Sequence, residues 1–196
     1  RTFRQLTPKE RLLNALYGKP VDRVPTFCSG CSQTVTVECM EATGIYWPDG
    51  HKDPEKMAKL SASVYKLTGL EVAGVPYCLT VEAEALGCQI MWSEEIDAIP
   101  QVLRTPYKTP AEVEIPSDFL SLKRAPVLLK AVKILKQNVG NELPIVAGVT
   151  GPFSLAGHLF GIENLLRWIV IDPMKVQGAV DKASEVGSTF GRALYE

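Results

Sequence analysis

The segment LPIVAGVTGPFSLAGHLFG, residues 143–161, joins an unbroken apolar run to a helical pattern that carries one of the chain's two histidines. The run at 143–149 is apolar throughout, which is typical of a strand buried on both faces of a parallel sheet. Proline is favoured in the first turn of a helix, so the sequence TGP at 150–152 predicts a tight turn into one. The segment therefore predicts a strand–turn–helix unit with His158 on the helix.

Two apolar stretches upstream are expected to be further buried strands, VPTFC at 24–28 and LEVAGVPY at 70–77. A hairpin is predicted from CQIMW and QVLRTPY, which flank the loop SEEIDAIP. Amphipathic helices are expected over residues 8–17, 34–43, 54–68, 126–138, 152–169 and from 172 onward. Strands that alternate with long helices indicate an α/β fold with a parallel sheet.

The two strongest helix starts carry recognisable capping residues. TPKE at 7–10 predicts a capping box, in which Thr7 and Glu10 satisfy each other's backbone donors. Asp53 and Pro54 predict a second helix start, and Gly69 predicts its end.

Composition narrows the class of partner. The 196 residues carry 21 basic and 22 acidic side chains, a net charge of −1, with no Lys/Arg block. Nucleic acid and anionic membrane surfaces are therefore not expected as main partners. No apolar run reaches the ~18–20 residues that span a bilayer. The start RTFRQLTPKE lacks the apolar core of a signal peptide, and the five cysteines are an odd number, so a cytoplasmic protein with reduced thiols is expected.

Three segments, in a consistent order over essentially the whole chain, resemble the uroporphyrinogen decarboxylase superfamily. They are TPKERLLNALYGKPVDRVP at 7–25, PYCLTVEAEALGC at 76–88 and VTGPFSLAGHL at 149–159. Within it, LTVEAEALG, TGPFSLAGHL and ENLLRWIVIDP are most similar to the methylcobamide:coenzyme M methyltransferase branch. The resemblance implies a (β/α)₈ TIM barrel with its active site at the carboxyl ends of the strands. Such a barrel usually needs about 250 residues, so residues 1–196 are expected to be a single domain, the N-terminal portion of the barrel.

The resemblance leaves tetrapyrrole decarboxylation as a disfavoured alternative. The decarboxylase branch clamps its substrate's carboxylates with an arginine loop, but the matching residues 27–34 contain no arginine. Cys78 stands where the resemblance places an essential aspartate, and His158 stands where it places a tyrosine. A thiol does not bind pyrrole N–H groups as an ionised carboxylate does.

The methyltransferase branch implies transfer of a methyl group from a corrinoid, held by a corrinoid protein, to a small thiol such as coenzyme M. Zinc holds that thiol as the thiolate, which is the nucleophile. The resemblance places the zinc ligands, a His-x-Cys pair and a later Cys, beyond Glu196. A third hypothesis is therefore a non-catalytic module that binds a corrinoid or a protein.

Three side chains are candidates for catalysis, each with a structural alternative: Cys78, Glu82 and His158. Cys78 follows a predicted strand, but no cation is near it in sequence, and it is otherwise an apolar wall. Glu82 and Glu84 are spaced by two, so only one is expected to point inward; the alternative is a charge that favours a helix N-terminus. His158 is expected to face the site, or to be a hydrogen-bonded structural residue.

Candidate substrate-binding residues follow the first and third predicted strands, and they are Cys28, Cys31, Thr150, Gly151 and Phe153. Cys28 and Cys31 form a C-x-x-C pair, which is a candidate for metal binding or for two thiols packed in a loop. Gly151 would let the backbone approach a ligand closely.

The remaining histidine and two cysteines are assigned no function. His51 is expected in an exposed loop, and Cys39 and Cys88 in the core. Isolated, the half barrel is expected to be marginally stable and to self-associate, because strands and apolar helix faces would stay uncovered.

Overall fold

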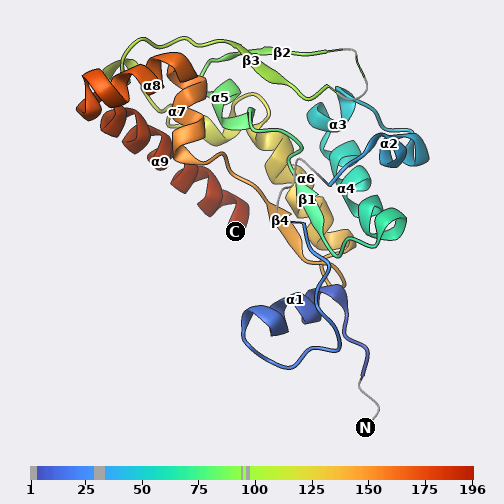
Figure 1. Ribbon diagram of the computed structural model, residues 1–196. Coiled ribbons are helices and arrows are strands. Elements are labelled where there is room, and N and C mark those ends of the chain that lie inside the picture. Colours follow the sequence, from blue (N-terminus) through green and yellow to red (C-terminus); the bar gives the residue numbers. More distant parts are fainter. Residues whose placement is uncertain (1–3, 29–33, 94, 96–97) are drawn as a thin grey trace. The chain divides into compact units, whose positions relative to one another are not determined.

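The computed structural model describes residues 4–28, 34–93, 95 and 98–196 (Figure 1). The chain divides into two compact units, the first formed by Arg1–Tyr77 with Lys130–Gly148 and the second by Cys78–Leu129 with Val149–Glu196. One of the three points at which the chain passes between the units falls within helix α6 (Ala125–Asn138). Within the described residues, no helix combines the length and apolar composition needed to cross a bilayer.

The described part of the first unit combines four complete helices and the C-terminal part of α6 with a parallel pair of strands (Figure 1). The helices are α1 (Pro8–Leu16), α2 (Val37–Thr43), α3 (Asp49–Lys52) and α4 (Pro54–Thr68). Strands β1 (Ala73–Val75) and β4 (Ile145–Ala147) pair with Ala73 opposite Ile145. Helix α4 packs on β1, where the Ser61 hydroxyl donates to the Gly74 carbonyl at 3.1 Å. The predicted strands at 70–77 and 143–149 are confirmed, and their parallel pairing agrees with the expected α/β class.

Both predicted helix starts in this unit are confirmed. The Glu10 backbone N–H donates to the Thr7 hydroxyl at 3.1 Å, and the Thr7 N–H donates to the Glu10 carboxylate at 3.0 Å. At α4, the Asp53 carboxylate accepts from two backbone N–H groups, and Gly69 ends the helix with a φ of 78°. These caps are confirmed because each involves only neighbours along the chain.

The predicted strand at 24–28 is wrong. Val24 is 82% exposed, and the segment has no strand pairing. The backbone of this segment bonds to the residues just before β1, where the Glu71 N–H donates to the Thr26 carbonyl at 2.7 Å. Pro25 has no N–H to give a ladder, so apolar composition alone did not make a strand here.

A buried ion network is formed by an arginine of α1. The Arg11 guanidinium, 1% exposed, donates to Asp22 at 2.7 Å and to Glu71 at 2.6 Å. The Arg11 hydrogen bond holds the pKa of Asp22 well below its usual range. Leu16 of the same helix is 73% exposed.

The expected exposed position of His51 is also wrong. His51 lies on α3, is fully buried, and stacks against the Trp47 ring with centroids 4.2 Å apart. Its sequence context, PDGHKDP, is polar on both sides, which is why the pattern indicated an exposed loop.

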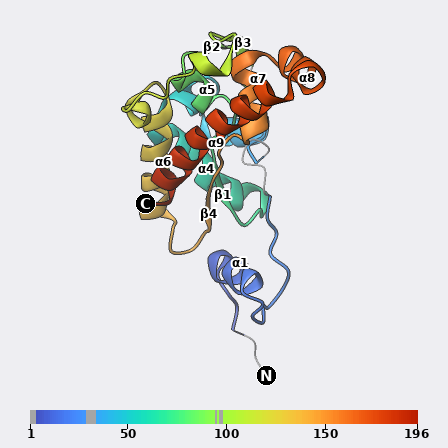
Figure 2. The same ribbon diagram turned by 90° about the vertical axis from the view of Figure 1, so that its left-hand side faces the viewer.

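The second unit joins an antiparallel hairpin to three helices that pack together (Figures 1 and 2). The hairpin strands are β2 (Gln89–Met91) and β3 (Gln101–Arg104), as predicted. The helices are α7 (Pro152–Phe160), α8 (Ile162–Ile171) and α9 (Pro173–Tyr195), with the short α5 (Val81–Ala85) against α7. Two 3-10 turns, η2 (Pro110–Glu112) and η3 (Phe119–Ser121), complete it.

Aromatic side chains fill the core of this unit. Phe119 meets Phe190 of α9 edge-to-face with ring centroids 5.8 Å apart, and Phe160 lies 5.6 Å from Trp168. The helix expected over 152–169 is two helices, because Gly161 adopts a φ of 84° between them. Cys88 is in the core as predicted, and its burial raises its pKa to about 12. Cys39, in the first unit, is also buried.

Candidate functional site

The candidate site lies in the second unit and is built from segments that follow the two parallel strands along the chain. Cys78, Thr80 and Glu82 come after β1, at the start of α5. Thr150 and Gly151 come after β4 and lead directly into α7. Each segment begins just after an apolar strand ends. The strand therefore fixes the position of the polar side chains that follow it.

A buried carboxylate ties these two segments together. Glu82, 2% exposed, accepts from the Thr150 backbone N–H at 2.6 Å and from the Thr150 hydroxyl at 2.9 Å. The Thr150 hydroxyl also lies 3.2 Å from the Leu79 carbonyl. Glu82 therefore fixes the turn after β4 against the start of α5, and it is not a solvated charge.

Arg124 is the site residue that sequence reasoning missed. Its guanidinium donates through Nη1 to the Cys78 sulfur at 3.2 Å, through Nη2 to the Thr80 hydroxyl at 2.8 Å, and through Nε to the Glu84 carboxylate. Trp92 covers it, with the guanidinium carbon 4.8 Å from the ring centroid. Arg124 is separated from Cys78 by 46 positions, so no local pattern pointed to this contact.

The expectation that only one of Glu82 and Glu84 points inward agrees with their burial, because Glu82 is 2% exposed and Glu84 is half-buried. The two carboxylates leave α5 on different faces, yet each finds a donor in the protein, Thr150 for Glu82 and Arg124 for Glu84. Helix α5 has only five residues and is buried along most of its length. Glu84 therefore pairs with Arg124 at a less buried position than the one that Glu82 occupies.

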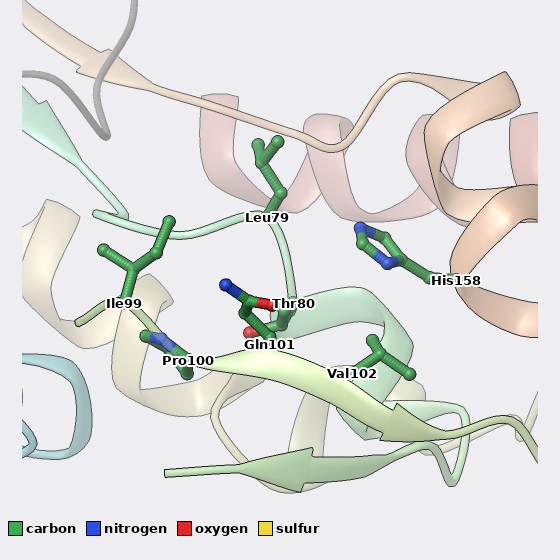
Figure 3. Close-up of a pocket in the computed structure, with 7 residues that line it drawn as sticks. All are labelled: Leu79, Thr80, Ile99, Pro100, Gln101, Val102 and His158. Carbon is green, nitrogen blue, oxygen red and sulfur yellow. The ribbon is translucent and has the colours of Figure 1, made fainter. Parts of the chain in front are cut away.

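A pocket of about 270 Å³ lies beside this network (Figure 3). Its lining residues come from the start of α5, the start of β3 and helix α7, and they are Leu79, Thr80, Ile99, Pro100, Gln101, Val102 and His158. Figure 3 shows the His158 ring reaching from α7 toward the space between Leu79 and Val102. Burial lowers the pKa of His158, and the nearby Glu82 charge opposes that shift. The pocket thus presents apolar walls with three polar groups.

The other predicted site residues lie outside this lining. Cys78 is 1% exposed and its sulfur accepts a hydrogen bond from Arg124, and Phe153 is 42% exposed. Gly151 is the exposed N-cap of α7. Cys28 is half-buried in the first unit, and Cys31 lies outside the described residues. Among the described residues, no group of three or more His, Cys, Asp or Glu side chains is placed to hold a metal ion.

The sequence profile of the uroporphyrinogen decarboxylase (URO-D) family matches residues 7–196. The chain therefore belongs to the URO-D family, as the three resembling segments predicted.

Methyltransferases match the chain at 35–44% identity, and uroporphyrinogen decarboxylases match it at 25–26% identity. The chain is 40% identical over 193 residues to the methylcobamide:CoM methyltransferase MtaA of Methanosarcina barkeri, covering 98% of this chain and 56% of that protein. It is 44% identical over 196 residues to MtbA of Methanosarcina mazei, with the same coverage. A solved methyltransferase from Methanosarcina mazei superposes with a TM-score of 0.87 at 39% identity, covering 97% of this chain and 56% of that one. The chain thus spans about half the length of the curated relatives it matches.

Proposed function

We propose that the protein transfers a methyl group from a methylated corrinoid, carried by a corrinoid protein, to a zinc-activated small thiol such as coenzyme M. One observation carries this proposal: the chain is 40% identical, over 98% of its length, to a methylcobamide:CoM methyltransferase. The structural likeness to a methyltransferase, with a TM-score of 0.87, supports it. In the same proposal, the chain is part of a (β/α)₈ barrel, and the segments after β1 and β4 belong to the mouth of that barrel.

The chemistry of the pocket favours this activity over tetrapyrrole decarboxylation. The described lining residues include no lysine or arginine. The guanidinium of Arg124 donates its hydrogen bonds to Glu84, Thr80 and Cys78. A substrate with many carboxylates needs cationic donors, and Arg is the usual partner for them. The buried Glu82 carboxylate near His158 further disfavours an anion here.

Zinc would supply the thiol substrate as a thiolate, which is the nucleophilic form. The described residues of this chain do not supply a ligand set for it. What these residues contribute is the pocket: Leu79, Ile99 and Val102 form its apolar part, while Thr80, Gln101 and His158 offer polar groups that could orient a ligand.

The proposal is tested by incubating the protein, in its full encoded length and loaded with zinc, with methylcobalamin and a small thiol. We expect the cobalt–methyl absorbance to decay and the thioether to accumulate in equal amount. A parallel incubation with uroporphyrinogen should release no CO₂. Absence of thioether from the zinc-loaded protein would count against methyl transfer, and CO₂ release would favour the decarboxylase alternative.

A further inference from the structure

The hydroxyl of Thr80 does not do what its position in the chain predicts. Thr80 is the N-cap residue of α5, and a threonine there normally accepts a hydrogen bond from the first turn of the helix. Its side chain makes no such bond. It accepts instead from Arg124 Nη2 at 2.8 Å and points its own proton toward the Cys78 sulfur at 3.4 Å. The Thr80 hydroxyl therefore bonds to Arg124 and Cys78 instead of capping α5.

Arg124 is placed by a strained backbone. The residue before it, Lys123, has a φ of 51°, in the left-handed region that non-glycine side chains rarely adopt. Such strain persists only where the surrounding structure holds the backbone in place. Here the strained residue precedes a guanidinium that is 5% exposed and contacts Cys78, Thr80 and Glu84.

We propose that Arg124 is a positioning residue that presents the Thr80 hydroxyl as a hydrogen-bond donor to an oxygen atom of the pocket ligand. Thr80, itself 2% exposed, is among the residues that line the pocket, and Arg124, which bonds to its hydroxyl, is not. Sulfur is a weak acceptor, so a ligand oxygen would take the Thr80 proton in preference to Cys78. The charged donor on the other side of the hydroxyl polarises it and strengthens that bond. This inference rests on the proposed function for the identity of the ligand.

The acceptor oxygen belongs either to the corrinoid, whose side chains carry amide carbonyls, or to the polar tail of the thiol. The two sources are separated by measuring KM for each substrate while the other is saturating. A hydrogen bond of ordinary strength, when lost, corresponds to an increase in KM of about tenfold for that one substrate.

The test is a double-mutant cycle in the zinc-loaded, full-length protein. Thr80→Val removes the hydroxyl at constant shape, Thr80→Ser keeps it, and Arg124→Lys keeps the charge but loses the forked contact. We expect Thr80→Val to raise one KM about tenfold with kcat changed less than about threefold, and Thr80→Ser to stay near wild type. Arg124→Lys should raise the same KM, and should add little in the Thr80→Val background. Arg167→Lys, at an exposed position of α8, is the matched control and should change nothing.

Additive effects of Thr80→Val and Arg124→Lys on KM would overturn the proposal, as would a Thr80→Ser variant as weak as Thr80→Val. If Arg124→Lys does not fold, the comparison of valine with serine at Thr80 decides alone. If the wild-type protein transfers no methyl group, the proposed function fails. In that case the same double-mutant cycle is measured by thermal unfolding. If the Tm shifts of Thr80→Val and Arg124→Lys are additive, Arg124 does not act through Thr80 and the proposal is overturned.

Discussion

Glu82 is the residue whose burial shapes the site most directly. It is 2% exposed, and its two oxygens accept from the N–H and the hydroxyl of Thr150. A glutamine has one acceptor oxygen and places an NH₂ against one of these two donors. Glu82→Gln should therefore lower the free energy of unfolding by about 1–3 kcal/mol, measured by urea denaturation. Glu163→Gln, at an exposed position of α8, should change it by less than about 0.5 kcal/mol. Equal effects of the two variants would show that the Thr150 contact contributes nothing.

His158 gives the site a pH dependence of defined sign. Burial lowers its pKa below the ordinary value of 6.5, so below that value the unfolded chain binds more protons at this residue than the folded one. Stability contributed by His158 is then complete above pH 6.5 and is lost as the pH falls. Burial disfavours the charged ring, and Glu82 only partly offsets this.

His158→Gln should accordingly flatten the loss of Tm between pH 7 and pH 5. The difference between the wild-type and variant curves isolates this histidine from His51 and from the carboxylates. If the two curves run parallel over that range, His158 has the same pKa in the folded and unfolded chain, and its assignment to a buried pocket fails.

At the scale of elements, the break between α7 and α8 depends on one glycine. Gly161 has a φ of 84° and a ψ of 129°, and a Cβ there would meet nothing closer than Asn164 at 3.6 Å. The space is open, so the cost of a side chain comes from the backbone conformation. Gly161→Ala should destabilise the protein by about 1–3 kcal/mol in urea denaturation.

Gly187 offers the matched control for that substitution. It lies inside α9 with open space around its position, so Gly187→Ala should be neutral or stabilising by up to about 1 kcal/mol. A Gly161→Ala variant as stable as Gly187→Ala would mean that α7 and α8 fuse into the one helix that the sequence pattern predicted over 152–169.

The sequence predicted those elements whose determinants are neighbours along the chain. The capping box at Thr7, the Asp53 helix start and the hairpin of β2 and β3 are all confirmed for this reason. The prediction of a strand at 24–28 failed because an apolar run becomes a strand only if a partner strand is there to pair with it. The prediction of one helix over 152–169 failed at Gly161, because a glycine in a helical pattern does not reveal the sign of its φ.

Only those site residues that directly follow a predicted strand could be predicted from the sequence. Glu82, Thr150 and His158 follow strands that the sequence indicated, and the structure brings them into one unit. Arg124 supplies three contacts from 40 to 46 positions away. Such pairing depends on tertiary folding, and composition carries no signal of it. The absence of a nearby cation in sequence was therefore no guide to the surroundings of Cys78.

At the scale of the whole molecule, apolar surface is the feature that governs behaviour in solution. In the second unit, α8 and the start of α9 share exposed apolar side chains, and they are Ile162, Leu166, Ile169, Val170, Ile171 and Met174. Val170 is 83% exposed and Met174 is 77% exposed. Contiguous patches of this kind are uncommon on monomeric proteins and mark surfaces that associate.

The 196-residue chain is therefore expected to self-associate at micromolar concentration through this patch, as sedimentation velocity would show. Replacing Val170 and Met174 together by lysine removes apolar area and adds like charges on both copies, so the sedimentation coefficient should fall toward that of the monomer. Replacing Ser188 and Thr189 by lysine adds the same charge at exposed positions of α9 outside the patch. If that control pair dissociates the chain equally well, net charge rather than the α8–α9 surface governs association. A wild-type chain that sediments as a monomer would show that these side chains find cover within one copy.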